Sequence, residues 1–237
     1  MALFAIGDLH LSFGVDKKMD VFGGKWENYE KKIHENWIST IKAEDTVILC
    51  GDTSWGMTLD EAMVDFEYIE SLPGKKILIK GNHDYWWTTV SKMNKFLDDC
   101  GIYSISFLHN EGEIIDGIPI SGSRGWFMGE GDANTDDKKI IHREADRLAL
   151  SIEKARTKAK KENITKSVSV FMHYQPAYGN LVCDEIFDVL KKYEIKDCYY
   201  GHIHYTGIRR AVTGEFEGVN LHLISADNVD FLPQMIL

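Results

Sequence analysis

Polar side chains of the kind that bind metal ions follow several apolar runs of this sequence, usually directly after a glycine. Four segments share the pattern, namely AIGDLH, ILCGDT, LIKGNHD and YYGHIH. A fifth run, VFMHYQP, ends at a histidine without the glycine. The residues supplied are Asp8, His10, Asp52, Asn82, His83, Asp84, His173, His202 and His204. Polar groups at the end of a buried strand are costly to desolvate unless they bind something, so the pattern predicts a ligand site.

The chemistry that these side chains could perform is that of metal ions. A mixture of imidazole and carboxylate ligands suits Zn, Fe or Mn more than Mg or Ca. The set exceeds the four ligands of one tetrahedral zinc, whereas two ions about 4 Å apart that share a carboxylate would use all of it. The candidate ligands are Asp8, His10, Asp52, Asn82, His173, His202 and His204. His83 would then be the catalytic neighbour of the ligand Asn82.

Each of these segments alone could be an ordinary strand end, since a single histidine there often has a structural role. Five such sites in succession are harder to explain by packing, because together they hold five of the nine histidines. Buried polar groups on this scale require partners. Asp8 and His10 are two residues apart, as are His202 and His204, so in extended chain each pair points to one side.

The elements that must position these residues alternate along the first half of the chain. Short, almost continuously apolar runs predict strands that are covered on both faces, at residues 3–6, 46–50, 76–80, 167–172 and 197–200. Segments with helical periodicity lie at residues 27–41, 58–72, 89–100 and 138–161. This alternation predicts an α/β layered fold, in which the carboxyl ends of the strands form one ligand crevice.

Three regions depart from the alternation. Residues 103–120 suggest a hairpin, and the last third of the chain again suggests antiparallel strands. Residues 126–137 form a polar, glycine-containing loop, either an active-site cover or a mobile connection. No repeat or clear linker interrupts the chain, so we expect a single domain over residues 1–237.

Composition restricts the partners. The chain of 237 residues has 27 Lys and Arg against 37 Asp and Glu, a net charge of −10. This acidity argues against duplex nucleic acid as a partner, since such binding relies on Lys and Arg at phosphates. No signal peptide precedes the first strand and no apolar run approaches the roughly 20 residues of a membrane span. With four scattered cysteines, these features predict a cytoplasmic protein with reduced thiols and no membrane association. The oligomeric state is not indicated.

The ordered motifs GDLH, GD, GNHD, H and GHIH, spanning residues 7–204, resemble those of the calcineurin-like metallophosphoesterase superfamily. The resemblance implies a four-layer αββα sandwich with two mixed β-sheets and a metal site at the carboxyl ends of the strands. It also implies two divalent metal ions per chain and hydrolysis of a small phosphorylated substrate, a phosphomonoester or a phosphodiester, by a metal-bridging hydroxide.

The same resemblance assigns roles to the residues. One metal would be held by Asp8, His10, Asp52 and His204, and the other by Asp52, Asn82, His173 and His202. Asp52 would bridge the two ions. His83 would be the catalytic residue beside the leaving oxygen, with Asp84 orienting its ring.

The sequence departs from the superfamily's protein phosphatases directly after the Asn-His motif. Those enzymes place a phosphate-binding arginine there, where this chain has Tyr85, Trp86 and Trp87. Arg124 could supply the positive group instead, and Trp86 could form an aromatic wall for a flat leaving group, although a surface arginine and core packing explain them too. Three alternatives remain open: a catalytically silent binding scaffold on the same fold, a nuclease of the same superfamily and a structural metalloprotein.

Overall fold

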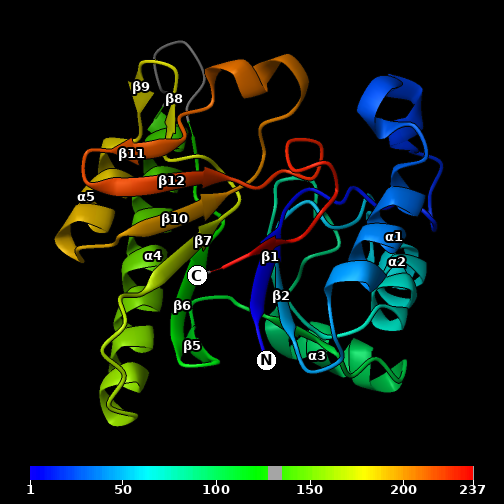
Figure 1. Ribbon diagram of the computed structural model, residues 1–237, viewed down its shortest axis with the longest axis horizontal. Coiled ribbons are helices and arrows are strands. Elements are labelled where there is room, and N and C mark those ends of the chain that lie inside the picture. Colours follow the sequence, from blue (N-terminus) through cyan, green and yellow to red (C-terminus); the bar gives the residue numbers. More distant parts are fainter. Residues whose placement is uncertain (128–134, 237) are drawn as a thin grey trace.

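The computed structural model describes residues 1–127 and 135–236, which form two β-sheets packed face to face between two layers of helices (Figure 1). The first sheet has the strand order β13-β1-β2-β3-β4. Its four parallel strands are β1 (Leu3–Ile6), β2 (Thr46–Cys50), β3 (Lys75–Ile79) and β4 (Ile105–Phe107), and β13 (Gln234–Met235) is antiparallel to β1. Helices α1 (Tyr29–Thr40), α2 (Leu59–Ser71) and α3 (Val90–Asp99) cover its outer face.

The second sheet has the strand order β11-β12-β10-β7-β6-β5. Its inner strands β12 (Val219–Leu223), β10 (Asp197–Tyr200), β7 (Ser169–Met172) and β6 (Ile118–Ser123) are parallel. The edge strands β11 (Gly214–Phe216) and β5 (Gly112–Ile115) are antiparallel to their neighbours. Helices α4 (Thr135–Lys161) and α5 (Asp184–Lys192) cover the outer face. The predicted α/β sandwich with two mixed sheets is therefore confirmed.

Smaller elements complete the connections between the strands. A two-stranded hairpin is formed by β8 (Ala177–Tyr178) and β9 (Leu181–Val182). Three 3-10 helices follow the first and last motifs, namely η1 (Met19–Phe22), η2 (Gly24–Trp26) and η3 (Tyr205–Arg210). None of the described helices has both the length and the apolar character needed to cross a membrane.

The almost continuous hydrophobicity of the strands follows from burial on both faces of each sheet. Along β1, Leu3 and Ala5 pack into the layer between the two sheets, while Phe4 and Ile6 pack against the helices of the first half. Because side chains of a strand alternate between its faces, both sets must be apolar. Two of the helices that cover the first sheet, α2 and α3, start at side-chain caps: Thr58 accepts from the backbone N–H of Glu61 at 3.2 Å, and Thr89 from that of Lys92 at 3.4 Å.

The predicted hairpin over residues 103–120 is only partly correct. Its first strand, β4, lies in the first sheet and runs parallel to β3, because α3 provides the crossover connection that parallel strands require. The chain then passes to the other sheet, where β5 and β6 form an antiparallel hairpin. Of the predicted loop at 126–137, residues 128–134 lie outside the described part of the chain, and α4 begins at Thr135.

Candidate metal centre

Five strand ends bring the predicted ligands to one end of the two sheets. In the first sheet, β1 leads to Asp8 and His10, β2 to Asp52, and β3 to Asn82. In the second sheet, β7 leads directly to His173, and β10 leads to His202 and His204. Parallel strands present their carboxyl ends at the same edge, which is why residues from 8 to 204 in the sequence can meet.

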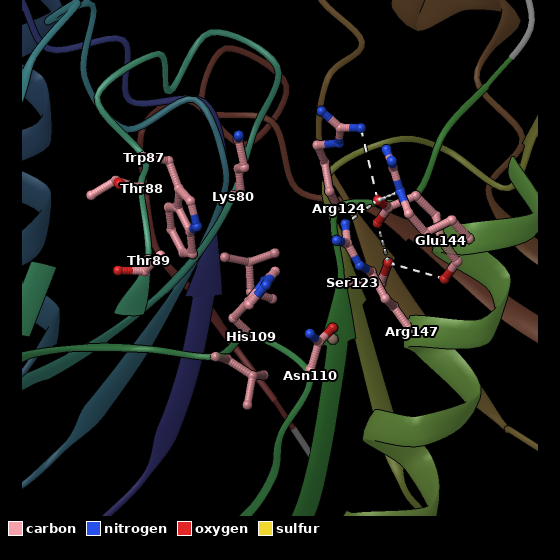
Figure 2. A pocket seen from close by; sticks show the side chains of 14 residues that line it. Lys80, Trp87, Thr88, Thr89, His109, Asn110, Ser123, Arg124, Glu144 and Arg147 are labelled. Atoms are coloured by element: carbon pink, nitrogen blue, oxygen red, sulfur yellow. Dashed lines mark hydrogen bonds and ion pairs between the residues drawn. The ribbon is translucent and has the colours of Figure 1, made fainter. Parts of the chain in front are cut away.

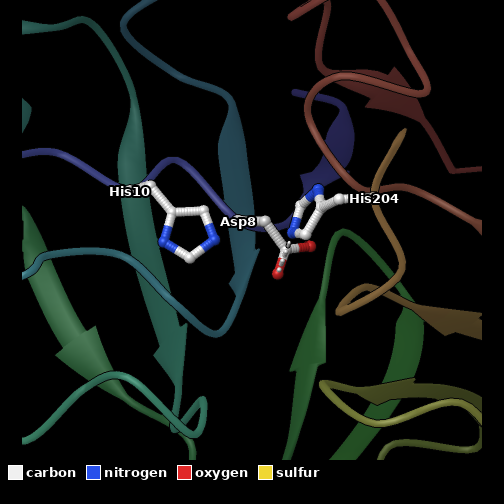
Figure 3. Close-up of side chains that lie close together, drawn as sticks. All are labelled: Asp8, His10 and His204. Carbon is white, nitrogen blue, oxygen red and sulfur yellow. Dashed lines mark ion pairs between the residues drawn. The ribbon is translucent and has the colours of Figure 1, made fainter. Parts of the chain in front are cut away.

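Two groups of three side chains lie close enough to hold an ion each. One group contains Asp8, His10 and His204, which are drawn in Figure 3, and the other contains Asp52, His173 and His202. Within each group, one potential ligand atom per residue lies within 4.8 Å of the others. The resemblance to the superfamily implies the same division of these six residues between two ions.

Asp52 and Asn82 complete the two groups. Oδ2 of Asp52 lies 3.8 Å from Nε2 of His10 in the first group and 3.6 Å from Nε2 of His173 in the second. The Asp52 carboxylate is thus positioned between them. Oδ1 of Asn82 lies 2.6 Å from Nε2 of His173, so its amide belongs to the second group.

The residues fit metal ions in their donor chemistry and in their unsatisfied atoms. Among the described residues, Nε2 of His204 is buried without a hydrogen-bond partner, and Nε2 of His10 faces Asp52 at 3.8 Å. Nε2 of His173 lies 3.2 Å from Nδ1 of His202, so two ring nitrogens face each other in a buried place. A cation that accepts these lone pairs would satisfy atoms that otherwise carry a desolvation penalty.

Burial and mutual repulsion perturb the titration of these groups. Burial, followed by the nearby Asp8 carboxylate, raises the pKa of Asp52 to about 8. Burial lowers the pKa of His202 to about 3 and also lowers the pKa of His10 and His173. These histidines are therefore neutral near pH 7, which is the form that binds metal. A cation would favour the ionised Asp52, because positive charge opposes the repulsion between the carboxylates.

The second histidine of the last motif behaves differently. Burial alone would lower the pKa of His204, but Asp8 and Asp227 raise it to about 10. Nδ1 of His204 lies 2.8 Å from Oδ1 of Asp227, and the second oxygen of Asp227 accepts from the backbone N–H of Tyr205 at 3.0 Å. Asp227 therefore fixes the His204 ring and directs its Nε2 toward Asp8, 3.4 Å away.

Sequence reasoning did not identify Asp227. Asp227 lies four residues after the end of β12, in the segment LHLISADN. As in the other motifs a strand precedes it, but no glycine stands directly before the acidic residue. Asp227 could have been found from its position, because Asp8 and Asp52 also follow closely after a strand.

The backbone at the centre has an unusual conformation that the glycines permit. Asp8, His10, Asp52 and His202 all have positive φ, between 48° and 70°, which costs free energy for residues other than glycine. A Cβ atom added at Gly81 would overlap the Asp52 carboxylate, and one at Gly201 would overlap that of Asp8. The glycines before the ligands thus allow strand-end backbone to approach carboxylates from neighbouring strands.

His83 lies at the rim of the centre, as its predicted catalytic role requires. Its Nε2 is 4.0 Å from Oδ2 of Asp52, and its side chain is 33% exposed, while His173 is fully buried. The Nδ1 of His83 is 3.4 Å from the hydroxyl of Tyr85, and the ring packs on Trp55 at a centroid distance of 4.4 Å.

The expectation that Asp84 orients the ring of His83 is wrong. The Asp84 carboxylate accepts hydrogen bonds from the backbone N–H groups of Asp52 (3.0 Å), Thr53 (2.9 Å) and Gly81 (2.7 Å). The strand-end loops leave several buried donors without partners, and a buried carboxylate satisfies them at once. Asp84 is a positioning residue for the loop that carries Asp52.

The expected aromatic wall is also corrected. Trp86 is only 3% exposed and packs in the core against Phe66 and Trp87, so it is unavailable to a substrate. Its place beside the centre is taken by Trp55, which stacks on His10 at 4.9 Å. Arg124 is 18% exposed and lines a cavity next to the centre, from the end of β6.

Comparisons with known proteins agree with this geometry. The family model described as calcineurin-like phosphoesterase matches residues 1–206. Among solved structures, the phosphopantetheinyl hydrolase PptH from Mycobacterium tuberculosis is similar with a TM-score of 0.55 and 16% identity, over 100% of this chain and 95% of that one. A protein of unknown function, AQ665 from Aquifex aeolicus, is similar with a TM-score of 0.50 and 17% identity, over 99% of this chain and 95% of that one.

No curated protein matches the sequence. The two structures share the fold with this chain, and the family model covers most of its length, including every strand that ends at a candidate ligand. The chain therefore belongs to the calcineurin-like phosphoesterase family and is a hydrolase of phosphoric esters.

Proposed function

We propose that this protein cleaves a small phosphomonoester or phosphodiester at a centre of two divalent metal ions. The observation that carries the proposal is the pair of three-residue groups with the Asp52 carboxylate between them. Asp8, His10, Asp52 and His204 would hold one ion, and Asp52, Asn82, His173 and His202 the other. Imidazole-rich ligand sets favour Mn, Zn or Fe.

When bound, two such ions activate water near neutral pH and polarise the phosphoryl oxygens. The chain's own residues do the rest. Asp84 and Asp227 hold Asp52 and His204 in place through buried hydrogen bonds. Trp55 and Trp26 pack against the His10 ring, at 4.9 and 5.9 Å, and exclude solvent from that side.

His83 is the residue that would act on the leaving group. Its side chain is 33% exposed, and its Nε2 faces the same Asp52 oxygen as that of His10 does. A protonated His83 can donate to the departing oxygen, and a neutral one can donate a hydrogen bond from Nε2–H. Burial, then the other histidines, lowers the pKa of His83, which keeps the proton easy to transfer.

A similar solved structure and the charge of the chain suggest which substrates to test. The Mycobacterium structure is that of a phosphopantetheinyl hydrolase, so esters of phosphopantetheine are reasonable test substrates for this chain as well. All four cysteines are free thiols, which supports the expectation of a cytoplasmic protein. Duplex nucleic acid is not an expected substrate, because the chain has a net charge of −10.

The test is a panel of phosphomonoesters, phosphodiesters and nucleotides, including 4-nitrophenyl phosphate and bis(4-nitrophenyl) phosphate. Each is assayed with Mn, Zn, Fe, Co and Mg after chelation, and bound metal is counted by mass spectrometry. We expect two ions per chain and turnover of at least one ester. Asp52→Asn should lose metal and activity together, whereas His34→Ala, a change of an exposed helix histidine, should lose neither. Two bound ions with no turnover of any ester would favour the binding-scaffold alternative.

A further inference from the structure

A cavity of about 360 Å³ lies next to the metal centre, between the two sheets. One wall comes from the first sheet and carries Lys80, Trp87 and His109, and the other comes from β6 and α4 and carries Arg124, Arg143 and Arg147 (Figure 2). A volume of this size is within the range of small-molecule sites.

Both walls of the cavity are directly connected to ligands of the centre. Lys80 follows β3 and is two residues before Asn82. On the other wall, the backbone oxygen of Arg124 accepts from the N–H of Tyr174 at 2.9 Å, and Tyr174 follows the ligand His173. The Tyr174 ring also packs on His202 at a centroid distance of 4.3 Å. A substrate held at the centre could therefore extend into this cavity.

The cavity has a large excess of positive charge for so acidic a protein. Its charged lining residues are Lys80, Arg124, Arg143, Arg147 and Glu144. The single carboxylate, that of Glu144, is 1% exposed and is shared by three guanidinium groups. Four cations against one carboxylate leave three positive charges without a neutralising partner in the cavity wall.

The contacts of Glu144 show how these cations are arranged. Oε1 of Glu144 is 2.6 Å from Arg147, 3.8 Å from Arg124 and 3.9 Å from Arg143, so only Arg147 is closely paired. Oε2 accepts from the hydroxyl of Ser123 at 3.0 Å. The buried carboxylate anchors Arg147 and leaves Arg124 only loosely held.

Two of the cations have donors that the described residues do not use. Nε of Arg124 is buried and has no hydrogen-bond partner within residues 1–127 and 135–236. Across the same residues, Lys80 forms no hydrogen bond or ion pair. An anion in the cavity would accept from these unused donors of the two partly buried cations and would stabilise their charge.

We infer that this cavity binds a second phosphate group of the substrate, so that the physiological ester carries two anionic groups, one at the metal centre and one between Lys80 and Arg124. Guanidinium groups bind phosphate through paired, charge-assisted hydrogen bonds, and a lysine adds a further point charge. The inference rests on the proposed function for the first of these groups, and it adds the recognition of the second.

The test uses matched phosphodiesters, 4-nitrophenyl alkyl phosphates whose alkyl chain of two, four or six carbons ends either in a hydroxyl or in a phosphate. For at least one chain length, the phosphate-terminated member should have the higher kcat/KM, through a lower KM. Arg124→Gln and Lys80→Gln should each reduce this preference by about 10- to 100-fold, as expected for the loss of a hydrogen bond to a charged group. Arg156→Gln removes the same charge from α4 at a different cavity and should leave the preference unchanged.

A second measurement separates this inference from the proposed function. Equilibrium dialysis of radiolabelled inorganic phosphate is done on the full chain, with metals loaded and after chelation. Phosphate that binds to the chelated wild type and not to Arg124→Gln supports the cavity site, even if no ester is turned over. Hydrolysis of the esters without preference for a terminal phosphate at any length, together with no phosphate binding after chelation, would overturn the inference and leave the proposed function standing.

Discussion

His83 differs from the histidines around it in having no close partner of its own. Asp8, His10, Asp52 and His173 are buried, whereas the side chain of His83 is 33% exposed. The His83 ring lies 4.0 Å from Asp52, makes a long contact to Tyr85 and packs on Trp55. Such a residue can change its protonation without rearranging the centre. Its contribution should therefore be to the rate and not to the assembly of the site.

His83→Ala should reduce kcat by about 100- to 10,000-fold while the protein keeps its two metal ions. The loss should be smaller for 4-nitrophenyl esters than for alkyl esters, since a good leaving group needs no proton. Metal analysis alongside kinetics on both esters checks this. If the variant loses an ion, His83 is a ligand and the assignment is incorrect.

Asp227 acts on the centre through His204. Asp227→Asn keeps the shape of the side chain but removes its charge, so the His204 ring loses its strongest orienting contact. We expect metal affinity to fall by about 10- to 100-fold, which is the usual effect of removing an outer hydrogen-bond partner. Competition with a chelating dye measures it. Asp230→Asn, at an exposed acidic residue nearby, is the control and should bind metal as the wild type does.

At the scale of the secondary-structure elements, β3 contains a charged residue at a buried position. Lys76 is fully buried, and its ammonium contacts the backbone oxygen of Leu72 and, at 3.1 Å, the hydroxyl of Ser104. Burial lowers the pKa of Lys76 from 10.5 to about 8. Lys76 therefore loses its proton at a lower pH in the folded protein than in the unfolded chain.

The sign of the resulting pH dependence follows from proton linkage. Between pH 8 and 10.5 the unfolded chain binds the proton and the folded protein does not, so the free energy of unfolding gains from rising pH. The difference in unfolding free energy, wild type minus Lys76→Met, should increase over this window. Urea unfolding at pH 7, 8, 9 and 10 measures it. Lys75→Met, at the exposed neighbour, should show no such trend, and a pH-independent difference at Lys76 would contradict the shifted pKa.

Most strands and helices could be predicted, because a buried strand requires a continuous apolar run and a helix that covers a sheet requires apolar residues at helical spacing. The strands β1, β2 and β10 match the predicted runs at 3–6, 46–50 and 197–200, since both of their faces are covered. The partner of β4 could not be predicted in this way. Its three residues carry no information about which sheet they join, and that choice depends on the crossover through α3.

The site was predictable where the residue type alone dictates the chemistry. Histidine and aspartate at five successive strand ends indicate metal ligands, so the candidate residues could be named from the sequence, whereas their division into two groups came from the family resemblance. The roles of Asp84 and Trp86 could not be predicted, because they depend on direction. The carboxylate of Asp84 points inward to backbone N–H donors and not toward His83. The side chain of Trp86 packs in the core and does not line the site.

At the scale of the whole molecule, the metal centre joins the two sheets. Asp8, His10, Asp52 and Asn82 come from the first sheet, and His173, His202 and His204 from the second. An ion held by ligands from both sheets would crosslink the sandwich at one end. It would also offset the repulsion between the Asp8 and Asp52 carboxylates. Metal binding should consequently stabilise the whole fold.

Chelation should lower the Tm by roughly 20 °C if each of the two ions is present at about 1,000 times its dissociation constant. Differential scanning calorimetry with and without a chelator gives the shift. The Asp52→Asn variant serves as the control, because a chelator has no ion to remove from it and should leave its Tm unchanged. An equal shift in the variant would mean that the stabilising ions are bound elsewhere.

The strand order of the first sheet also has a consequence for protein synthesis. β1 is made before the other strands of the two sheets, yet one of its edges pairs with β13, and the His204 that faces Asp8 is fixed by Asp227. A nascent chain that has emerged as far as β4 holds Asp8, Asp52 and Asn82 but none of the second sheet's histidines. The chain must therefore emerge from the ribosome as far as Asp227 before the complete centre can form, so a translation product that ends before β7 would be unable to hydrolyse phosphate esters in the cell.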